Sequence, residues 1–203
     1  MKTRGINLAI SSALAAAVVR GAEPPPEPAL TGGFVGRPQY QTTAGLFSAG
    51  TAFTIEVEDE PAVLMLTAQH VFGPAGGLDK DIKKAAMPNF VQEGALVCFI
   101  RKLPMFARLE ALPGSGAGVD VAVFRTNLRG AAAPRRLTAK NPRRGETLWL
   151  AAELPGQPSE RHLFPCTVLQ VAGDRMQCRF ADGNLSLRGA SGAPSTHTSP
   201  ATA

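Results

Sequence analysis

The chain has 203 residues, of which 44% are apolar and 18% are charged, enough for one ordinary domain or two small ones packed together. Its 21 glycines and 17 prolines are too few for a collagen-like or wholly disordered chain. The formal charge of +5 falls to +2, with 18 basic residues against 16 acidic ones, once Lys2, Arg4 and Arg20 near the N-terminus are set aside. A general binder of nucleic acids is therefore not expected.

Residues 1–22 have the pattern of a signal peptide. Lys2 and Arg4 give a positive start, the mostly apolar run 6–19 is short for a bilayer span, and small residues follow it. The cleavage site stays open, because a cut after Ala22 would leave Arg20 at the third position back. We expect a secreted or periplasmic protein with no membrane span after signal removal; an uncleaved helix or anchor is the alternative.

Residues 23–45 read as a proline-rich linker. The segment begins with the acidic, proline-rich run 23–28 and shows little periodicity. We therefore predict an extended connection without a core of its own, which ends where the first β unit begins at residue 46.

From residue 46 onward the pattern is one of short strands separated by turns. Apolar and polar residues alternate with period two over 51–58, and helix signals are scarce, with one candidate turn at 81–87. A turn- and proline-rich stretch at 128–144 divides the strands into two groups. The predicted strands lie at 51–58, 62–67, 94–100, 106–112 and 119–125, and then at 146–153, 163–171 and 175–180. This spacing favours an all-β protein, a sandwich or small barrels, in two units.

Three side chains stand in positions from which they could carry chemistry. His70 follows a buried strand, Asp120 stands at the start of another, and Ser191 lies between glycines in the run RGASGAP. Each has an ordinary structural reading: a structural histidine, a strand cap and a turn residue. Their order along the chain, His then Asp then Ser, is one of the orders known for a serine triad.

The contexts TAQH, DVAV and GASGAP together resemble the three signatures of the chymotrypsin-like (trypsin-like) serine peptidase family, closest to its bacterial secreted branch. The resemblance spans roughly residues 44–194 and is dense only at these motifs. It implies two packed antiparallel β-barrels, an N-terminal one over 46–128 with His70 and Asp120 and a C-terminal one over 129–203 with Ser191. It also implies a secreted endopeptidase that hydrolyses protein or peptide substrates through an acyl-enzyme and without a cofactor.

The resemblance further implies a role for each site residue. His70 would be the general base, Asp120 would orient its ring, Ser191 would be the nucleophile, and the amides of Gly189 and Ser191 would form the oxyanion hole. Ala190 stands where many members keep an aspartate that pairs with a new N-terminus, so activation of the trypsinogen type is not implied. Leu185 stands at the pocket-floor position, which favours a small or apolar substrate residue over a basic one.

Only twelve residues follow Ser191, and they lack apolar alternation. We therefore expect the second barrel to be incomplete, residues 195–203 to form no good strand, and His197 to be a tail residue. Two further hypotheses follow from this departure. One is an inactive truncated relative that acts as a binding module or is a non-functional fragment; the other is a β-barrel binding protein in which the three motifs coincide by chance.

The chain has three cysteines. Their spacing from one another and from the histidines is not that of metal ligands, so we predict no metal site. Cys98 lies in an apolar strand and reads as a buried thiol. Cys166 and Cys178 flank a hairpin and are candidates for a disulfide. A three-residue loop at 171–173 would make the two cysteines face each other, whereas a two-residue turn at 173–174 would put them on opposite faces. The oligomeric state is not readable from the sequence.

Overall fold

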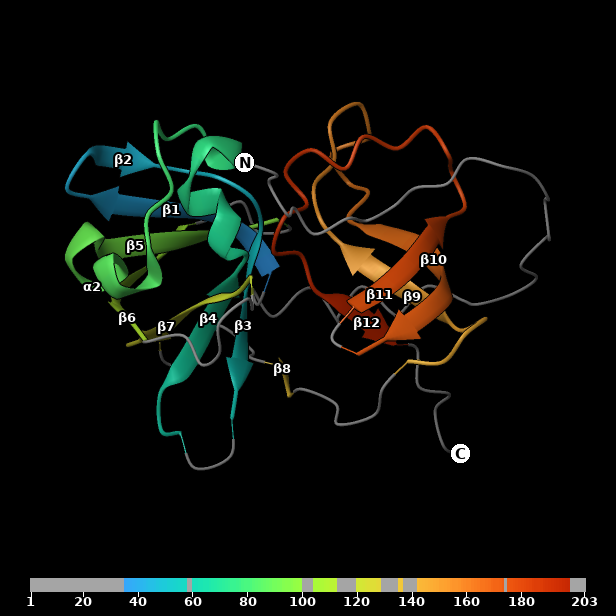
Figure 1. Ribbon diagram of the computed structural model, residues 1–203, viewed down its shortest axis with the longest axis horizontal. Helices are drawn as coiled ribbons and strands as arrows, with labels where there is room; N and C mark the ends of the chain where they lie inside the picture. Colours follow the sequence, from blue (N-terminus) through green and yellow to red (C-terminus); the bar gives the residue numbers. More distant parts are fainter. Residues whose placement is uncertain are drawn as a thin grey trace.

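The computed structural model describes residues 35–57, 60–99, 104–112, 120–128, 135–136, 142–173 and 175–197. These residues form two β units that lie side by side (Figure 1). The signal peptide and most of the linker predicted above lie outside the described residues. Helical structure in these described ranges is confined to short turns: η1 (Gln69–Phe72), η2 (Pro74–Gly76), η3 (Lys84–Ala86) and α2 (Met87–Phe90). The all-β prediction is therefore confirmed. None of the helices in the described ranges is long and apolar enough to cross a membrane.

The first unit is a closed antiparallel barrel of six strands. They are paired in the order β1-β5-β6-β7-β4-β3, and a further pairing between β1 and β3 closes the ring. β2 extends the sheet beside β1, and the short β8 runs parallel to β3. The bounds are β1 (Val35–Thr42), β2 (Gly45–Phe47), β3 (Ala52–Glu56), β4 (Val63–Thr67), β5 (Val91–Cys98), β6 (Pro104–Ala111), β7 (Ala122–Thr126) and β8 (Arg135–Arg136).

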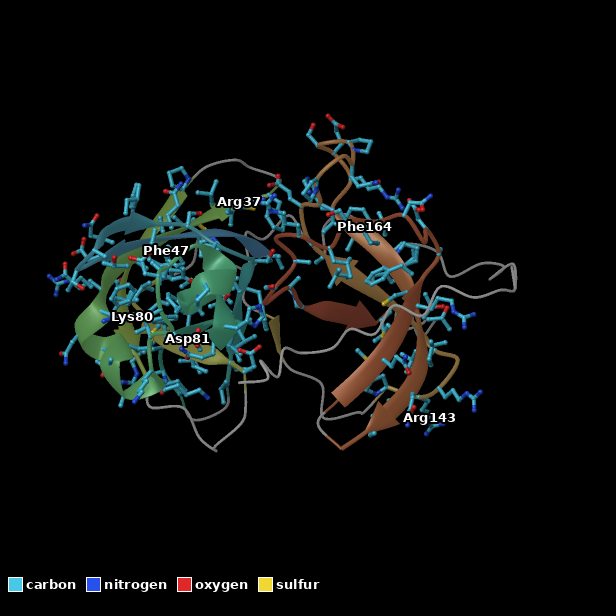
Figure 2. All side chains as sticks on the ribbon, turned by 45° about the horizontal axis from the view of Figure 1, so that its top comes forward. Arg37, Phe47, Lys80, Asp81, Arg143 and Phe164 are labelled. Carbon is cyan, nitrogen blue, oxygen red and sulfur yellow. The ribbon has the colours of Figure 1, made fainter. Side chains whose placement is uncertain are left out.

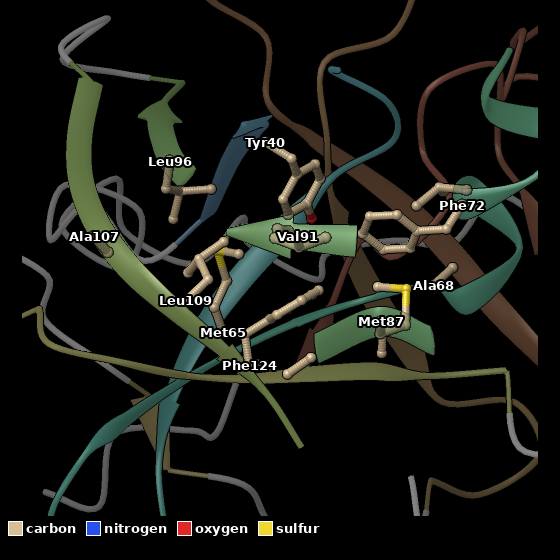
Figure 3. Close-up of a cluster of buried hydrophobic side chains, with 14 of the residues drawn as sticks. Tyr40, Met65, Ala68, Phe72, Met87, Val91, Leu96, Ala107, Leu109 and Phe124 are labelled. Carbon is tan, nitrogen blue, oxygen red and sulfur yellow. The ribbon is translucent and has the colours of Figure 1, made fainter. Parts of the chain in front are cut away.

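Alternating burial along the barrel strands builds one apolar core. In β7, for example, every second residue is buried, which is the period expected of a strand with one face inward. The centre of the core is aromatic: the rings of Tyr40 and Phe72 lie 4.9 Å apart, and those of Phe72 and Phe124 lie 5.9 Å apart (Figure 3). Tyr40 and Phe124 are fully buried. Because Phe72 belongs to η1, the same packing anchors the turn that carries His70.

The first strand corrects the predicted linker, because residues 35–42 form β1 instead of an extended connection. Pro38 misled the sequence reading, since proline removes a backbone donor. On the side of β1 away from β5, however, β3 pairs only with residues 35–36 and β2 only with residues 40–42. The Pro38 carbonyl faces this gap, where it accepts a hydrogen bond from the Ser48 hydroxyl at 2.8 Å. The missing N–H of Pro38 therefore breaks no ladder.

The second unit is a four-stranded antiparallel sheet in the order β11-β10-β9-β12. Its strands are β9 (Thr147–Ala151), β10 (Leu163–Ala172), β11 (Arg175–Phe180) and β12 (Ser195–His197). The inward face carries a separate apolar cluster around Leu148, Phe164 and Val168. Within the described residues, β11 and β12 each have a neighbour on one side only, so this sheet is not a closed barrel.

β12 corrects the expectation that residues 195–203 form no strand. Ser195, Thr196 and His197 pair with Leu150, Trp149 and Leu148 of β9. Strand pairing uses backbone groups, so an edge strand needs no apolar alternation when a neighbour offers a free edge. His197 is accordingly a strand residue.

The two units are held together by apolar packing, with an ion pair at the rim. Val35 and Phe99 of the first unit pack against Ala151 of the second. Arg37 lies 3.5 Å from a carboxylate oxygen of Glu153, and Figure 2 shows it at the boundary between the units. This packing fixes how the ends of the barrel strands meet the turn that contains Ser191.

Phe124→Ala tests the barrel core. We expect it to lower the free energy of unfolding by roughly 3–5 kcal/mol, because a fully buried ring is replaced by a cavity. Phe106→Ala is the matched control, since its ring is 76% exposed and its loss should change the stability by less than about 0.5 kcal/mol. Urea unfolding followed by fluorescence measures both, and equal losses for the two variants would contradict the proposed core.

Candidate functional site

Strand pairing brings His70 and Asp120 to the same end of the barrel. β4 and β7 run antiparallel with Thr67 opposite Ala122, so the chain that leaves β4 and the chain that enters β7 lie next to each other. The Gln69 amide donates to the Asp120 carbonyl at 3.3 Å across this junction. Val71 and Phe72 follow His70 into the core, which fixes the turn and leaves the imidazole at the barrel rim.

Both carboxylate oxygens of Asp120 are used to hold His70. Oδ1 accepts the backbone N–H of His70 at 2.8 Å, and Oδ2 lies 2.5 Å from Nδ1 of the ring. An ionised carboxylate only accepts hydrogen bonds, so this contact places the ring proton on Nδ1. Nε2 is then free to accept a proton, and it lies 2.9 Å from the hydroxyl oxygen of Ser191. The three residues thus form one continuous hydrogen-bonded chain that joins the two units.

Ser191 lies in a tight turn that presses against the barrel. Gly189 and Gly192 on either side have φ values of +85° and +86°, which side chains disfavour. A Cβ atom at position 192 would lie 2.4 Å from the Thr51 carbonyl oxygen and 2.7 Å from the Ala68 amide nitrogen. Glycine is therefore required there by space as well as by conformation.

Two backbone amides near the Ser191 hydroxyl differ from their neighbours in the turn. The Ala190 amide donates to the Leu187 carbonyl at 3.0 Å, and the Ala193 amide donates to the Ala190 carbonyl at 2.8 Å. By contrast, the amides of Gly189 and Ser191 donate to no acceptor among the described residues. These are the two donors that the sequence nominated for the oxyanion hole, and their hydrogens remain available to a ligand.

An apolar pocket of about 480 Å³ opens beside this chain of residues. Its walls come from both units, and His70, Asp120 and Ser191 are among the residues that line it. The apolar wall contributed by the second unit consists of Leu150, Cys166, Met176, Cys178, Phe180, Leu187, Ala190 and Ala193.

The position of Leu185 corrects a sequence prediction. Its side chain is buried in the apolar cluster of the second sheet and does not line the pocket, whereas Leu187 does. Counting back from the serine predicted Leu185, whereas Leu187 is the leucine among the residues that line the pocket.

Cys166 and Cys178 lie on the same inward face and their thiols are free. The hairpin pairs Ala172 with Arg175, which leaves a two-residue connection and would by itself put the cysteines on opposite faces. One extra residue, Leu169, interrupts the ladder between Val168 and Gln170, and this bulge restores the common face. The pKa of the Cys166 thiol is raised, first by its hydrogen bond with the Cys178 thiol and then by burial. Cys98 is a buried thiol in the barrel, as predicted.

Thr51 and Thr67 are contacts of the Ser191 turn that the sequence did not reveal. The Thr51 amide and hydroxyl both donate to this turn, and the Thr67 hydroxyl donates to the Thr51 carbonyl at 2.8 Å. Each threonine stands in an ordinary strand pattern, so no local signal marks it. In the described ranges, no cluster of histidine, cysteine, aspartate or glutamate side chains is suited to hold a metal ion.

The cysteine register predicts thiols that stay free. Cys166 lies opposite Phe180, so Cys178 is its diagonal neighbour, and diagonal Cα atoms in a sheet are about 7–8 Å apart, beyond the usual span of a disulfide. We expect the protein, unfolded without reductant, to titrate three thiols per chain. Titration of one thiol, together with a mass lower by two hydrogens, would instead demonstrate a bridge.

The sequence matches no family model and no curated protein. Similarity appears at the level of structure. The thermostable serine protease AL20 from an extremophilic microorganism aligns with a TM-score of 0.50 and 13% identity over 83% of this chain and 80% of that one. Deg5 aligns with a TM-score of 0.52 and 15% identity over 83% and 76%. The HtrA-type protease AlgW, solved with a tripeptide, aligns with a TM-score of 0.51 and 15% identity over 83% and 48%. At these identities the likeness concerns the fold, and the chain has the fold of the trypsin-like and HtrA-type serine proteases.

Proposed function

We propose that this protein is a serine endopeptidase that hydrolyses peptide bonds through His70, Asp120 and Ser191. The observation that carries the proposal is the hydrogen-bonded chain from the Asp120 carboxylate through both ring nitrogens of His70 to the Ser191 hydroxyl. Three residues from separate segments and from both units meet in the order that nucleophilic catalysis requires. No step of the proposed mechanism calls for a cofactor.

The proposed mechanism begins with activation of the nucleophile. A serine hydroxyl is a weak nucleophile at neutral pH, so a base must take its proton as the oxygen attacks the substrate carbonyl. Nε2 of His70 is placed to accept that proton. Asp120 holds the opposite ring nitrogen and stabilises the imidazolium that forms. The same imidazolium then donates its proton to the leaving amine, and an ester between Ser191 and the acyl half of the substrate remains.

The negative oxygen of the tetrahedral intermediate needs donors that are already in place. The amides of Gly189 and Ser191 meet this need because the loop leaves both without an acceptor in the described residues. Loss of one such donor raises the barrier by about 2.7–4 kcal/mol in other serine proteases. Water then attacks the ester with His70 again as base, which releases the acid and regenerates the Ser191 hydroxyl.

The pocket wall suggests which peptides are cleaved. Met176, Phe180 and Leu187 offer apolar surface within the pocket beside Ser191. Among the described residues of the second unit, no acidic side chain lines the pocket. A basic substrate residue would lose its hydration there without gaining a counter-ion, whereas a small or apolar residue would bury its surface. We therefore propose a substrate preference for small or apolar side chains before the cleaved bond.

The open second sheet supports one competing proposal. β11 and β12 have unpaired edges within the described residues, and such edges pair readily with an extended peptide. An inactive relative could use these edges and the apolar pocket to hold a peptide without cleaving it. A β-barrel binding protein with coincidental motifs is less well supported, since it does not account for the hydrogen-bonded chain.

A serine-directed peptidyl phosphonate distinguishes the peptidase from the binding module. We expect it to label the protein and to abolish hydrolysis of peptide substrates with a small or apolar residue before the cleaved bond. Ser191→Ala should lose both, and Ser186→Ala is a matched control with an exposed serine five residues away. Asp120→Asn should lower kcat by roughly 10⁴-fold, the loss known for the equivalent change in other serine proteases.

Each other outcome selects a different function. Peptide binding without labelling or hydrolysis would favour the binding module. Labelling that persists in Ser191→Ala would contradict the assigned nucleophile.

We also propose that the protein is exported, on the basis of Lys2, Arg4 and the apolar run 6–19. Expression in a bacterial host should yield a shortened chain outside the cytoplasm, measured by fractionation and N-terminal sequencing. A chain that starts at Met1 and stays in the cytoplasm would contradict export and would leave the proposed chemistry intact.

A further inference from the structure

Thr51 has no part in the chemistry proposed above, yet it donates two hydrogen bonds from the barrel to the Ser191 turn. Its side chain is buried, and the residue is only 1% exposed. Its amide donates to the Ser191 carbonyl at 2.8 Å, and its hydroxyl donates to the Gly189 carbonyl, also at 2.8 Å. One residue of the first unit thus bonds to two carbonyls of the second.

These bonds hold the two peptide planes on either side of the plane that contains the Ser191 amide. The Gly189 carbonyl belongs to the plane of residues 189–190 and the Ser191 carbonyl to the plane of residues 191–192. The plane between them contains the Ser191 amide, and its carbonyl, on Ala190, accepts from the Ala193 amide at 2.8 Å. All three planes are therefore held by hydrogen bonds, two of them by Thr51.

Gly189 is the residue of this loop whose flanking peptide groups can rotate most easily. With φ at +85° and no Cβ, its flanking peptides rotate more easily than those of any other residue type. A Cβ built there meets no atom nearer than 3.9 Å, so steric contact does not restrain the position. The bond from the Thr51 hydroxyl to the Gly189 carbonyl supplies the restraint that packing does not.

The neighbouring residue shows that the contact is close. A Cβ at Gly50 would lie 2.7 Å from the Ser191 carbonyl oxygen, which requires glycine immediately before Thr51. Thr51 itself is held within the barrel, because its carbonyl accepts a hydrogen bond from the Thr67 hydroxyl. The residue therefore has a fixed position from which it can orient the loop.

We propose that Thr51 is a positioning residue whose hydroxyl holds the peptide between Gly189 and Ala190. This peptide joins the plane that carries the Gly189 amide to the plane that carries the Ser191 amide, so holding it aims both amides at the oxyanion. This inference rests on the proposed function and deepens it. Without the hydroxyl, the Gly189 carbonyl loses its donor and the loop gains alternative conformations. The substrate pocket keeps its walls, because Thr51 is not among the residues that line it.

Thr51→Val removes the hydroxyl with little change in shape. Loss of an oxyanion donor lowers kcat by about 10²–10³-fold, and a displaced donor loses part of that, so we expect kcat to fall by about 10- to 100-fold. KM should stay nearly unchanged, because the pocket is intact. Thr51→Ser keeps the hydroxyl and should recover most of the activity.

Thr126→Val is the matched control. Its buried hydroxyl also donates to a backbone carbonyl at 2.8 Å, that of Val63, within the barrel and away from the Ser191 turn. This variant should keep the kcat of the parent protein. If it loses as much activity as Thr51→Val, a general loss of stability explains both, and the proposal is overturned.

A peptide aldehyde separates positioning from structure. Ser191 adds to the aldehyde and the resulting oxygen occupies the oxyanion hole, so its affinity should fall with kcat in Thr51→Val and remain unchanged in Thr126→Val. A Thr51→Val protein with the kcat and aldehyde affinity of the parent would overturn the proposal.

Hydrogen exchange tests the same inference without any reaction. The amides of Ala190 and Ala193 bond within the turn, and their exchange in residues 187–194 should quicken in Thr51→Val while Thr126→Val matches the parent. If the parent chain neither reacts with the phosphonate nor hydrolyses peptides, the proposed function fails by itself. Unchanged exchange in Thr51→Val would then overturn the role of Thr51 separately.

Discussion

The antiparallel pairing of β4 with β7 is the constraint on which the candidate site depends. It makes the end of one strand and the start of the other neighbours at the barrel rim, although His70 and Asp120 are fifty residues apart in the chain. The carboxylate then needs no long side chain to reach the imidazole, and its second oxygen can hold the backbone of the same residue. A pair of side chains built in this way is held in place by the packed barrel core behind it.

The third member of the site depends on a different kind of contact. Ser191 belongs to the second unit, so its distance from His70 is set by how the two units pack. Apolar contacts around Val35, Phe99 and Ala151 bring the units together without directional preference. The hydrogen bonds from Thr51 orient the Ser191 turn relative to the barrel, because they are made at defined backbone atoms of the turn.

Much of this arrangement could be read from the sequence, and the reasons for the failures are physical. Period-two alternation located β3, the spacing of short strands and turns located β7, β10 and β11, and the local motifs singled out His70, Asp120 and Ser191. β1 was missed because a proline-rich segment with little periodicity favours a linker. The position at which Pro38 lacks an N–H faces a gap between two short neighbouring strands, which only the tertiary structure reveals. β12 was missed because it forms by pairing its backbone with the free edge of β9. The side chains of residues 195–197 do not encode that pairing.

Contacts between segments that are distant in the chain were not predicted, because they too depend on the tertiary structure. Nothing in the strand pattern of Thr51 distinguishes it from Thr54, which is equally buried but has no hydrogen-bond partner for its hydroxyl among the described residues. Leu187 lines the pocket and Leu185 does not, because the count of residues from the serine does not by itself determine the local backbone path.

The bulge at Leu169 couples the length of the hairpin to the chemistry of the pocket wall. The residues that face the pocket from β10 and β11 do so only because one extra residue offsets the two-residue connection. An insertion or deletion of one residue between Cys166 and Cys178 would turn one strand over and exchange apolar pocket surface for polar side chains. A change of two residues would leave the inward face as it is. In natural variants of this chain whose pocket stays apolar, the hairpin should therefore differ in length by an even number of residues.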